Sequence, residues 1–428
     1  MIFEPCFIMR VIYTVLFYFL TPFILLRLFW RSIKAPDYRL RWLERFGFYK
    51  QIYPQDVIWF HAVSVGEAEA LFPLLKLIQQ RNSDANILIT TTTPTGSARV
   101  KAVMAESVSH VYLPYDMPDS VNRFIAKFKP KLAVIMETEI WPNLYRACAN
   151  NHIPLYVINA RLSEKSARGY QKIPSLVNIA LASVESIATQ TQEDTDRFIG
   201  IGANKACVLT LGNIKFDLEV SESVISSGAE LKETLFAGRF VWVIASTHKD
   251  EEAIFLAIYK QLKLKIPQLL LLIVPRHPER FNDVKLLCIQ DQLNVVLRTS
   301  GEPVTQSTDI YLVDTMGELK LLYASSDVAF VGGSMVPVGG HNILEASVIG
   351  VPVMFGPYMT NFKEISRRVI EQQAAIQCNT SNEVIDNLLS LYQHVDQRTT
   401  LIARGKQFIQ QNQGAINRIY ALLSEHLS

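Results

Sequence analysis

Continuous apolar runs alternate with helical patterns along most of this 428-residue chain. A strand that is covered on both faces carries apolar side chains at successive positions, so such runs are typical of parallel sheets. The runs that we expect to form strands are residues 57–64, 85–93, 110–116, 132–139, 154–161, 186–190 and 207–212, and then 241–247, 269–276, 294–299, 309–315, 328–334 and 351–356. The two series predict two α/β units, each built on a doubly wound parallel sheet.

The same pattern predicts how the chain divides. We expect a membrane anchor with a basic segment at 1–35, a first α/β domain at 36–212, a linker at 213–240, a second α/β domain at 241–400 and a C-terminal helix at 401–428 that packs back toward the first domain. The linker prediction rests on the polar and small residues of IKFDLEVSESVISSGAE. Ligands of such sheets bind beyond the carboxyl ends of the strands, and we expect them between the two sheets.

The anchor prediction comes from VIYTVLFYFLTPFILL at residues 11–26, a stretch without a charged residue. A membrane span takes about 20 apolar residues, so this stretch is short for crossing a bilayer and long enough to lie in one leaflet. Whether it crosses or lies flat stays open at this point. A buried core helix is the alternative, and a cleaved signal peptide is disfavoured because LRLFWRSIK offers no small-residue cleavage site.

Basic residues follow the apolar stretch. Between residues 27 and 50 there are seven Lys or Arg against two acidic residues. Such a segment attracts anionic headgroups, and the positive-inside rule would keep the rest of the chain on the cytoplasmic side. An ordinary solvated helix face is the alternative interpretation.

Composition excludes several classes of protein. The formal net charge is only +2, so we expect no nucleic acid partner. The five cysteines are scattered and odd in number, which favours a reducing compartment over a disulfide framework. Neither an Asp-x-Asp pair nor a His/Cys ligand set stands near the strand ends, and we therefore expect no obligatory metal and no cofactor.

The densest candidate site is VGGSMVPVGGHNILEASVIGVPVMFGP in the second series. Its first glycine pair ends a strand, and we expect Gly339, Gly340, His341 and Asn342 to open a helix. Glycine lets a ligand approach the backbone, and the first turn of a helix has free N–H groups, so a phosphate would fit here. Glu345 could accept hydrogen bonds from ribose hydroxyls. The alternative is that the glycines only make turns.

Other strand ends of the second series add complementary chemistry. One run ends with Arg276 and His277, and Arg276 could clamp a phosphate or carboxylate through a bidentate hydrogen bond. Another ends with Ser246, Thr247 and His248 before a helix. Gly317 and Glu318 stand at a helix start, where backbone amides could recognise a base or a sugar edge; simple capping would explain this carboxylate equally well.

In the first series, Glu67 follows the strand 57–64 directly after a glycine. The glycine permits a sharp turn that would aim the carboxylate outward. The segment SVGE also fits a capping box with Ser64, and spacing alone does not choose between the two interpretations.

Further candidate residues for ligand binding follow two other strands of the first series. Glu137 and Glu139 bracket the end of the strand 132–139, and which of them faces the ligand stays open. Trp141 and Asn143 offer a stacking surface and an amide, although a tryptophan in the core is the plainer interpretation. The segment TTTTPTG adds Thr93, Thr95 and Gly96, whose hydroxyls and turn suit phosphates or sugars, and threonines are also ordinary strand residues.

The combination of SVGE, TTTTPTG, ETEIWPN, NARLS, GNIKFD, PRHPER, MGEL and GGSMVPVGGHNILE resembles the membrane-associated Kdo transferases of lipopolysaccharide synthesis in Gram-negative bacteria. The likeness spans essentially the whole chain, the apolar N-terminal stretch included. It implies the two-domain GT-B glycosyltransferase fold. It also implies transfer of Kdo (3-deoxy-D-manno-oct-2-ulosonic acid) from CMP-Kdo to the glucosamine disaccharide of a lipid A precursor, lipid IVA, with inversion at the transferred carbon.

The resemblance also implies roles for the candidate residues. Glu67 becomes the catalytic base, and the second domain binds the donor CMP-Kdo at the inner membrane's cytoplasmic face. The donor site then comprises Ser246, Thr247, Arg276, His277, Met316, Gly317, Glu318, Gly333, Ser334, Gly339, Gly340, His341, Asn342 and Glu345. Two alternatives remain: another GT-B enzyme such as a sugar-nucleotide epimerase, or a membrane-tethered nucleotide-sugar binding protein without turnover.

Overall fold

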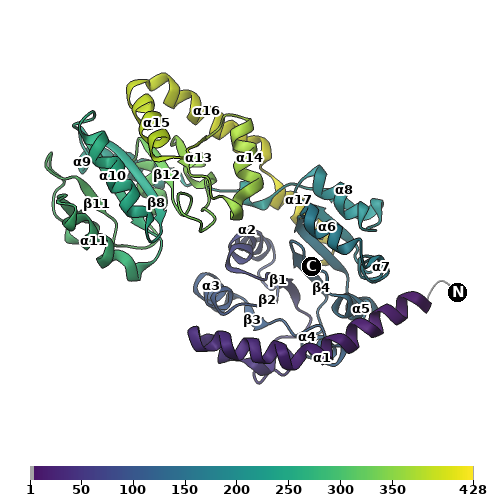
Figure 1. Cartoon of the computed structure of the whole chain (residues 1–428). Helices are drawn as coiled ribbons and strands as arrows, with labels where there is room; N and C mark the ends of the chain where they lie inside the picture. Colours follow the sequence, from purple (N-terminus) through teal and green to yellow (C-terminus); the bar gives the residue numbers. More distant parts are fainter. Residues whose placement is uncertain (1–3, 428) are drawn as a thin grey trace. The chain divides into compact units, whose positions relative to one another are not determined.

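The computed structural model describes residues 4–427 and divides the chain into two compact units. Unit 1 contains the chain up to Asp217 together with the last residues from Gln413, and unit 2 runs from Leu218 to Asn412. Both units are parallel sheets with helices on their two faces, as the sequence predicts (Figure 1).

Unit 1 is built on a seven-stranded parallel sheet in the order β3-β2-β1-β4-β5-β6-β7. The strands are β1 (Ile58–His61), β2 (Ile87–Thr91), β3 (Ser109–Tyr112), β4 (Leu132–Met136), β5 (Leu155–Ala160), β6 (Ser186–Thr189) and β7 (Val208–Thr210). Successive side chains of β1 point to opposite faces: Trp59 packs in one apolar cluster, and Ile58 and Phe60 pack in the other. Both faces are therefore covered, which explains why the strands read as unbroken apolar runs.

The helices of unit 1 are α1 (Glu4–Lys34), α2 (Val65–Arg81), α3 (Pro94–Met104), α4 (Pro118–Phe128), α5 (Pro142–Asn150), α6 (Glu164–Tyr170), α7 (Pro174–Leu181), α8 (Gln192–Gly200) and α17 (Ala415–Leu423). Helices α2, α3 and α17 supply the cluster around Phe60, and α4, α5, α7 and α8 supply the cluster around Trp59. Among the described residues, one stretch is long and apolar enough to cross a membrane: Ile8–Ile33 within α1, with a mean hydropathy of 1.9.

Unit 2 repeats the architecture with the strand order β10-β11-β9-β8-β12-β13-β14. Its strands are β8 (Phe240–Thr247), β9 (Leu269–Pro275), β10 (Val295–Leu297), β11 (Ile310–Leu312), β12 (Val328–Val331), β13 (Val353–Phe355) and β14 (Ile376–Gln377). Its helices are α9 (Glu222–Thr234), α10 (Glu251–Lys263), α11 (Phe281–Gln290), α12 (Leu319–Ala324), α13 (Leu344–Ile349), α14 (Lys363–Glu371), α15 (Ser381–Gln393) and α16 (Val395–Asn412).

The structure differs from the sequence-based expectation at three places. Residues 213–240, expected as a linker, contain α9, whose Gly228 packs so closely on Ala324 of α12 that a Cβ there would lie 2.3 Å from the alanine's Cβ. The single helix expected at 401–428 is the end of α16 followed by α17, with a turn at Gly414. Strand β14 was not predicted, because two residues carry no readable pattern.

Candidate active site

Three neighbouring strands of unit 1 bring charged side chains together at their carboxyl ends. Glu67 lies on the first turn of α2 after β1, Glu137 follows β4 and Arg161 follows β5. Arg161 Nε donates to Glu137 Oε2 at 2.7 Å, and the charge of Glu137 raises the pKa of Glu67. The predicted base and one of the two predicted partner carboxylates therefore belong to one cluster.

The carboxylate of Glu67 is held by short local contacts. Its Oε2 accepts from the backbone N–H of Val63 at 2.8 Å, and its Oε1 accepts from Ser64 Oγ at 3.0 Å. In a full capping box the serine side chain accepts a hydrogen bond from a helix amide. Here the Ser64 hydroxyl donates to Glu67 instead. Capping accounts for part of the segment SVGE, and each carboxylate oxygen keeps a lone pair for a proton.

Burial gives Glu67 the proton affinity that a base needs near neutral pH. Desolvation by burial, and secondarily the negative charge of Glu137, raise the pKa of Glu67 to about 7. The hydrogen bonds from Val63 and Ser64 act in the opposite direction and are outweighed. The fold itself therefore supplies the desolvation that raises the pKa of Glu67.

Glu137 is fixed by its backbone as well as by Arg161. Its side chain is buried, its φ is 58°, and its N–H donates to the carbonyl of Ile158 at 3.0 Å. A left-handed φ is unfavourable for a residue with a Cβ and is kept only where surrounding contacts hold it. Such strain directly after a strand is common at functional sites.

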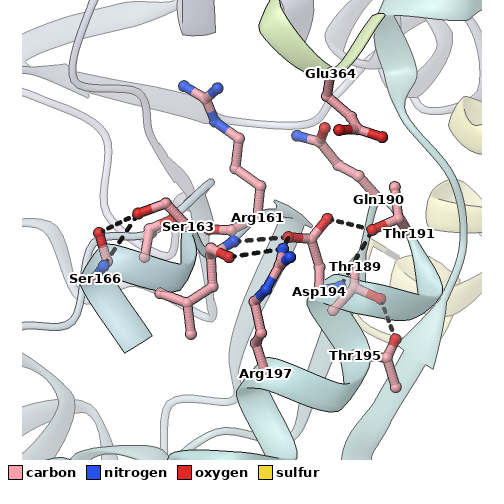
Figure 2. A network of polar contacts seen from close by, with 12 residues as sticks. Arg161, Ser163, Ser166, Thr189, Gln190, Thr191, Asp194, Thr195, Arg197 and Glu364 are labelled. Atoms are coloured by element: carbon pink, nitrogen blue, oxygen red, sulfur yellow. Dashed lines mark hydrogen bonds and ion pairs between the residues drawn. The ribbon is translucent and has the colours of Figure 1, made fainter. Parts of the chain in front are cut away.

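The loop that carries Arg161 is held by Asp194 (Figure 2). Asp194 Oδ1 accepts from the N–H of Leu162 at 2.8 Å, and its Oδ2 accepts from Thr191 Oγ1 at 2.8 Å. Arg197 adds a bond to the carbonyl of Leu162 at 3.2 Å. This network fixes the backbone next to Arg161 while its guanidinium stays exposed and reaches Glu137.

Glu139 makes the third carboxylate of this region. Burial raises its pKa to about 7, with the charge of Glu137 adding to the effect and the hydrogen bond from Trp141 opposing it. Trp141 Nε1 donates to Glu139 Oε2 at 2.9 Å, and Tyr145 donates to the Glu139 carbonyl at 2.6 Å. Trp141 also packs against the core, so it is both a core residue and a partner of a carboxylate.

Lys215 also belongs to this cluster, although its position in the sequence did not indicate a functional role. Burial lowers the pKa of Lys215, while the charges of Glu137 and Glu67 favour its protonated form. Lys215 is part of the segment GNIKFD, one of the motifs that carry the family resemblance. It follows β7 in the 3-10 turn Ile214–Phe216. Arg161 was likewise visible only as part of NARLS.

Four other acceptor candidates are engaged in local structure. Asn143 is buried, its amide donates to the carbonyl of Asp116 at 2.8 Å, and it exchanges hydrogen bonds with Thr14. Thr93 caps α3 by accepting from the N–H of Gly96 at 3.1 Å, and Thr95 donates to Thr93 at 3.4 Å. These contacts within the fold account for the presence of Asn143, Thr93, Thr95 and Gly96 at these positions. The proposed acceptor site therefore does not include these four residues.

In unit 2, the adjacent strands β9, β8 and β12 end at a cluster of three histidines. The rings of His248 and His341 are stacked with their Nε2 atoms 2.8 Å apart, and His277 lies edge-on to His248. Burial and the positive charge of Arg276 lower the pKa of His341 to about 3. His341 is therefore neutral at pH 7, and the short contact with His248 has one donor nitrogen and one acceptor.

The glycine-rich loop after β12 is organised by a buried carboxylate. Glu251, the first residue of α10, accepts from the N–H groups of Gly333 at 2.7 Å, Ser334 at 3.1 Å and Met335 at 2.9 Å. The N–H of Gly340 donates to the carbonyl of Gly333 at 2.8 Å. An internal anion and the loop's own backbone therefore take the N–H groups of Gly333, Ser334, Met335 and Gly340. That other amides of this turn bind a phosphate stays a prediction.

The helix after this loop also begins later than expected. Residues 339–343 form a turn, and α13 starts at Leu344. Gly340 has φ 73°, and a Cβ there would lie 2.2 Å from Met359 Sδ, so the position requires glycine. Asn342 accepts from the N–H of Leu344 at 3.1 Å and donates to Glu345 at 3.2 Å.

The remaining donor candidates lie at the end of β8 or after β9, β11 or β12, and they differ in their contacts and exposure. Glu318 pairs with Arg298 at 2.9 Å, and this hydrogen bond lowers its pKa. Thr247 is buried and donates to Glu252 at 2.8 Å, and Ser246 has a left-handed φ of 58°. Exposed at these ends are Arg276, His277, Met316 and Gly317, whereas Ser334 and Gly339 are buried.

Among residues 4–427, no group of three or more His, Cys, Asp or Glu is arranged to hold a metal ion. That a metal is dispensable for the reaction stays a prediction.

Two doubly wound α/β units, each with polar side chains at the carboxyl ends of its strands, define a protein with a GT-B-like fold. The fold agrees with the solved UDP-GlcNAc 2-epimerase from Neisseria meningitidis, with a TM-score of 0.58 over 86% of this chain and 99% of that one. Sequence identity to it is 14%, so this likeness concerns the fold alone.

The sequence relatives are more specific. Residues 40–218 match the family model described as 3-Deoxy-D-manno-octulosonic-acid transferase (kdotransferase). The 3-deoxy-D-manno-octulosonic acid transferase of Haemophilus influenzae is 39% identical over 98% of this chain and 99% of its own length. A probable mitochondrial 3-deoxy-D-manno-octulosonic acid transferase of Arabidopsis thaliana is 33% identical over 96% of this chain and 92% of its own. The chain belongs to the Kdo transferase family.

Proposed function

We propose that this Kdo transferase takes Kdo from CMP-Kdo and attaches it to the glucosamine disaccharide of a lipid A precursor, with Glu67 as the general base. The observation that carries the proposal is the carboxylate of Glu67, which has a pKa of about 7 and belongs to a cluster with Glu137 and Arg161 at adjacent strand ends. A base with a pKa near the working pH is the most effective one.

In the proposed reaction a hydroxyl of the acceptor sugar attacks the anomeric carbon of Kdo. Glu67 takes the hydroxyl proton as the new C–O bond forms, and the bond from that carbon to the phosphate oxygen breaks on the opposite face. CMP leaves with the bonding electron pair, and no covalent intermediate forms, which accounts for inversion. Arg276 is exposed at the end of β9 and supplies the positive charge that the departing phosphate needs.

Unit 2 is the proposed donor side. Its exposed Arg276 and His277 stand beside the histidine pair and the glycine turn, which together offer cationic, neutral and backbone hydrogen-bonding groups to an anionic nucleotide sugar. Unit 1 is the proposed acceptor side, with Glu137, Glu139 and Lys215 around the base. We further propose that α1 anchors the protein at the cytoplasmic face of the inner membrane, where a lipid acceptor is available.

The test is incubation of the purified full-length protein with CMP-Kdo and the tetra-acylated lipid A precursor, with the products weighed by mass spectrometry. We expect products heavier by one or more Kdo units, and the masses give their number. Glu67→Ala should still bind CMP, measured by calorimetry, and should lose transfer by about 10²-fold or more. Near-native transfer by Glu67→Ala would refute the base assignment, and the absence of any product from the unaltered protein would refute the substrates.

A further inference from the structure

Helix α1 has two faces of opposite character. One stripe is partly or fully buried against unit 1 and recurs about every three or four residues: Tyr13, Thr14, Phe17, Thr21, Ile24, Leu28 and Ser32. The opposite face is apolar and exposed, with exposed fractions of 53% for Ile12, 68% for Phe19, 65% for Leu26 and 60% for Ile33. An exposed apolar face of this length needs an apolar partner.

The buried stripe is held to unit 1 by polar side chains. Tyr13 donates to Asp116 Oδ2 at 3.0 Å, and Thr14 exchanges hydrogen bonds with the amide of Asn143 at 3.1 and 3.2 Å. Tyr18 donates to Asp119 on α4. The helix is therefore a fixed part of unit 1, and Figure 1 shows it lying lengthwise along this unit.

The length of the buried stripe determines the orientation that α1 can take in a bilayer. From Tyr13 to Ser32 the helix rises about 28 Å, close to the hydrocarbon thickness of about 30 Å. If α1 crossed the bilayer while docked, Asp116 and Asp119 would enter the hydrocarbon with it. Charged groups at that depth are strongly disfavoured, so the docked helix fits a bilayer only when it lies flat.

The charges near the end of α1 favour a lipid surface as the partner of the apolar face. Arg27, Arg31 and Arg39 are exposed, and the apolar face also ends in this region with the exposed Trp30. Arginine and tryptophan side chains are typical of the boundary between headgroups and acyl chains.

The docked stripe also reaches the carboxylate cluster. Asp116 is buried, and it accepts from Tyr13 and from the N–H groups of Asn143 at 3.0 Å and Leu144 at 2.7 Å, the first turn of α5. That helix begins one residue after Trp141, which holds Glu139. Three hydrogen bonds, Tyr13–Asp116, Asn143–Asp116 and Trp141–Glu139, therefore connect α1 to Glu139 through the start of α5.

The geometry points to α1 as an in-plane helix that embeds its apolar face in a single leaflet of an anionic bilayer, with Asp116 as a positioning residue between this helix and the Glu139 loop. The first part stands on the docking alone. The role of Asp116 toward the acceptor rests on the proposed function.

The orientation is tested by spin-label depth measurement on full-length protein in phosphatidylethanolamine–phosphatidylglycerol vesicles. Labels go on Ile12→Cys, Phe19→Cys, Leu26→Cys and Ile33→Cys, with Cys6 and Cys207 replaced by alanine. Collision rates with oxygen and with a water-soluble nickel complex should give the same shallow depth at all four positions. A spanning helix would place Phe19→Cys and Leu26→Cys about 10 Å deeper than the outer two and would overturn the proposal. Labels shielded from both reagents before vesicles are added would show that a second copy covers the face, which overturns it as well.

The positioning role is tested with Tyr13→Phe, which removes one hydrogen bond to Asp116 and leaves the caps of α5. We expect the KM for the lipid acceptor to rise about 3- to 10-fold while the KM for CMP-Kdo stays unchanged. The matched control is Tyr156→Phe, which removes the hydroxyl that contacts His426 at 3.1 Å elsewhere in unit 1. An unchanged acceptor KM, or equal changes for both substrates, would overturn the role of Asp116. Transfer absent from the unaltered protein would instead refute the proposed function, and the depth result would still stand.

Discussion

At the scale of single residues, the proton affinity of Glu67 is set by two opposing influences. Burial and the charge of Glu137 raise its pKa, and the hydrogen bonds from Val63 and Ser64 lower it, with a balance at about 7. A base acts only when ionised, so transfer should rise with pH through about 7 and be lost below it. Arg161 holds Glu137 in place and is itself held through the loop that Asp194 fixes.

Glu137→Gln should move the acidic limb of the pH profile to lower pH. Removing a negative charge near Glu67 favours the ionised form of the base, so its pKa falls, by about one unit or less. The measurement is kcat/KM for the acceptor from pH 5 to 9. Glu69→Gln is the control, because Glu69 lies on the same helix and pairs with Arg99 away from the cluster. A limb that stays in place in Glu137→Gln would contradict the electrostatic coupling.

The sequence pointed to most of these residues and left their partners hidden. Glu67 and Glu137 stood out because each lies where an apolar run ends, Glu67 after a glycine, and the family resemblance then assigned Glu67 as the base. Arg161 and Lys215 are surface-type residues whose importance depends on neighbours from other strands, which spacing along the chain does not reveal. Asn143 and Thr93 were assigned to the acceptor for their chemistry, and the structure shows both serving as local contacts of the fold.

At the scale of elements, the strands were predictable and the glycine loop was only partly so. Each long strand is buried on both faces, and a strand buried in this way needs apolar side chains at successive positions. The glycine pairs include a position at which a side chain would not fit, because a Cβ on Gly340 would collide with Met359. That these glycines admit a ligand stays a prediction. What occupies the loop's amides was not readable, because Glu251 lies 82 residues before Gly333 in the chain.

Glu251→Gln should loosen this loop and weaken donor binding. The carboxylate accepts three loop amides, and a glutamine would turn an NH₂ group toward some of these donors, leaving buried groups unpaired at about 1–3 kcal/mol each. We expect a lower melting temperature and a rise of roughly tenfold or more in the Kd for CMP, measured by calorimetry. Glu279→Gln, an exposed carboxylate in the same unit, is the control. Native CMP affinity in Glu251→Gln would show that the loop keeps its form without the anion.

At the scale of the whole molecule, the chain leaves unit 1 after Asp217 and returns to it at Gln413. Asp217 links the segment that leaves unit 1 to the segment that returns to it. Its carboxylate accepts hydrogen bonds from the N–H groups of Gly414 and Ile416 at the start of α17. Helix α17 then fills part of the unit 1 core with Ile416, Ile419 and Leu423. Unit 1 is therefore assembled from both ends of the sequence, whereas unit 2 is one continuous segment.

Removing residues 413–428 should therefore unfold unit 1 and spare unit 2. Three apolar side chains of α17, together with Leu427, are buried in the unit 1 core, and at about 1.5–3 kcal/mol each their loss amounts to roughly 6–12 kcal/mol. That range is comparable with the whole stability of a typical domain, about 5–15 kcal/mol. Calorimetry of the truncated protein should show a single transition, that of unit 2, and CMP should still raise its midpoint. Ile419→Ala provides the milder comparison, with an expected loss of about 2–5 kcal/mol confined to unit 1. If the truncated protein kept a native-like transition for unit 1, the helix would be a surface attachment and its core position would contribute little to stability.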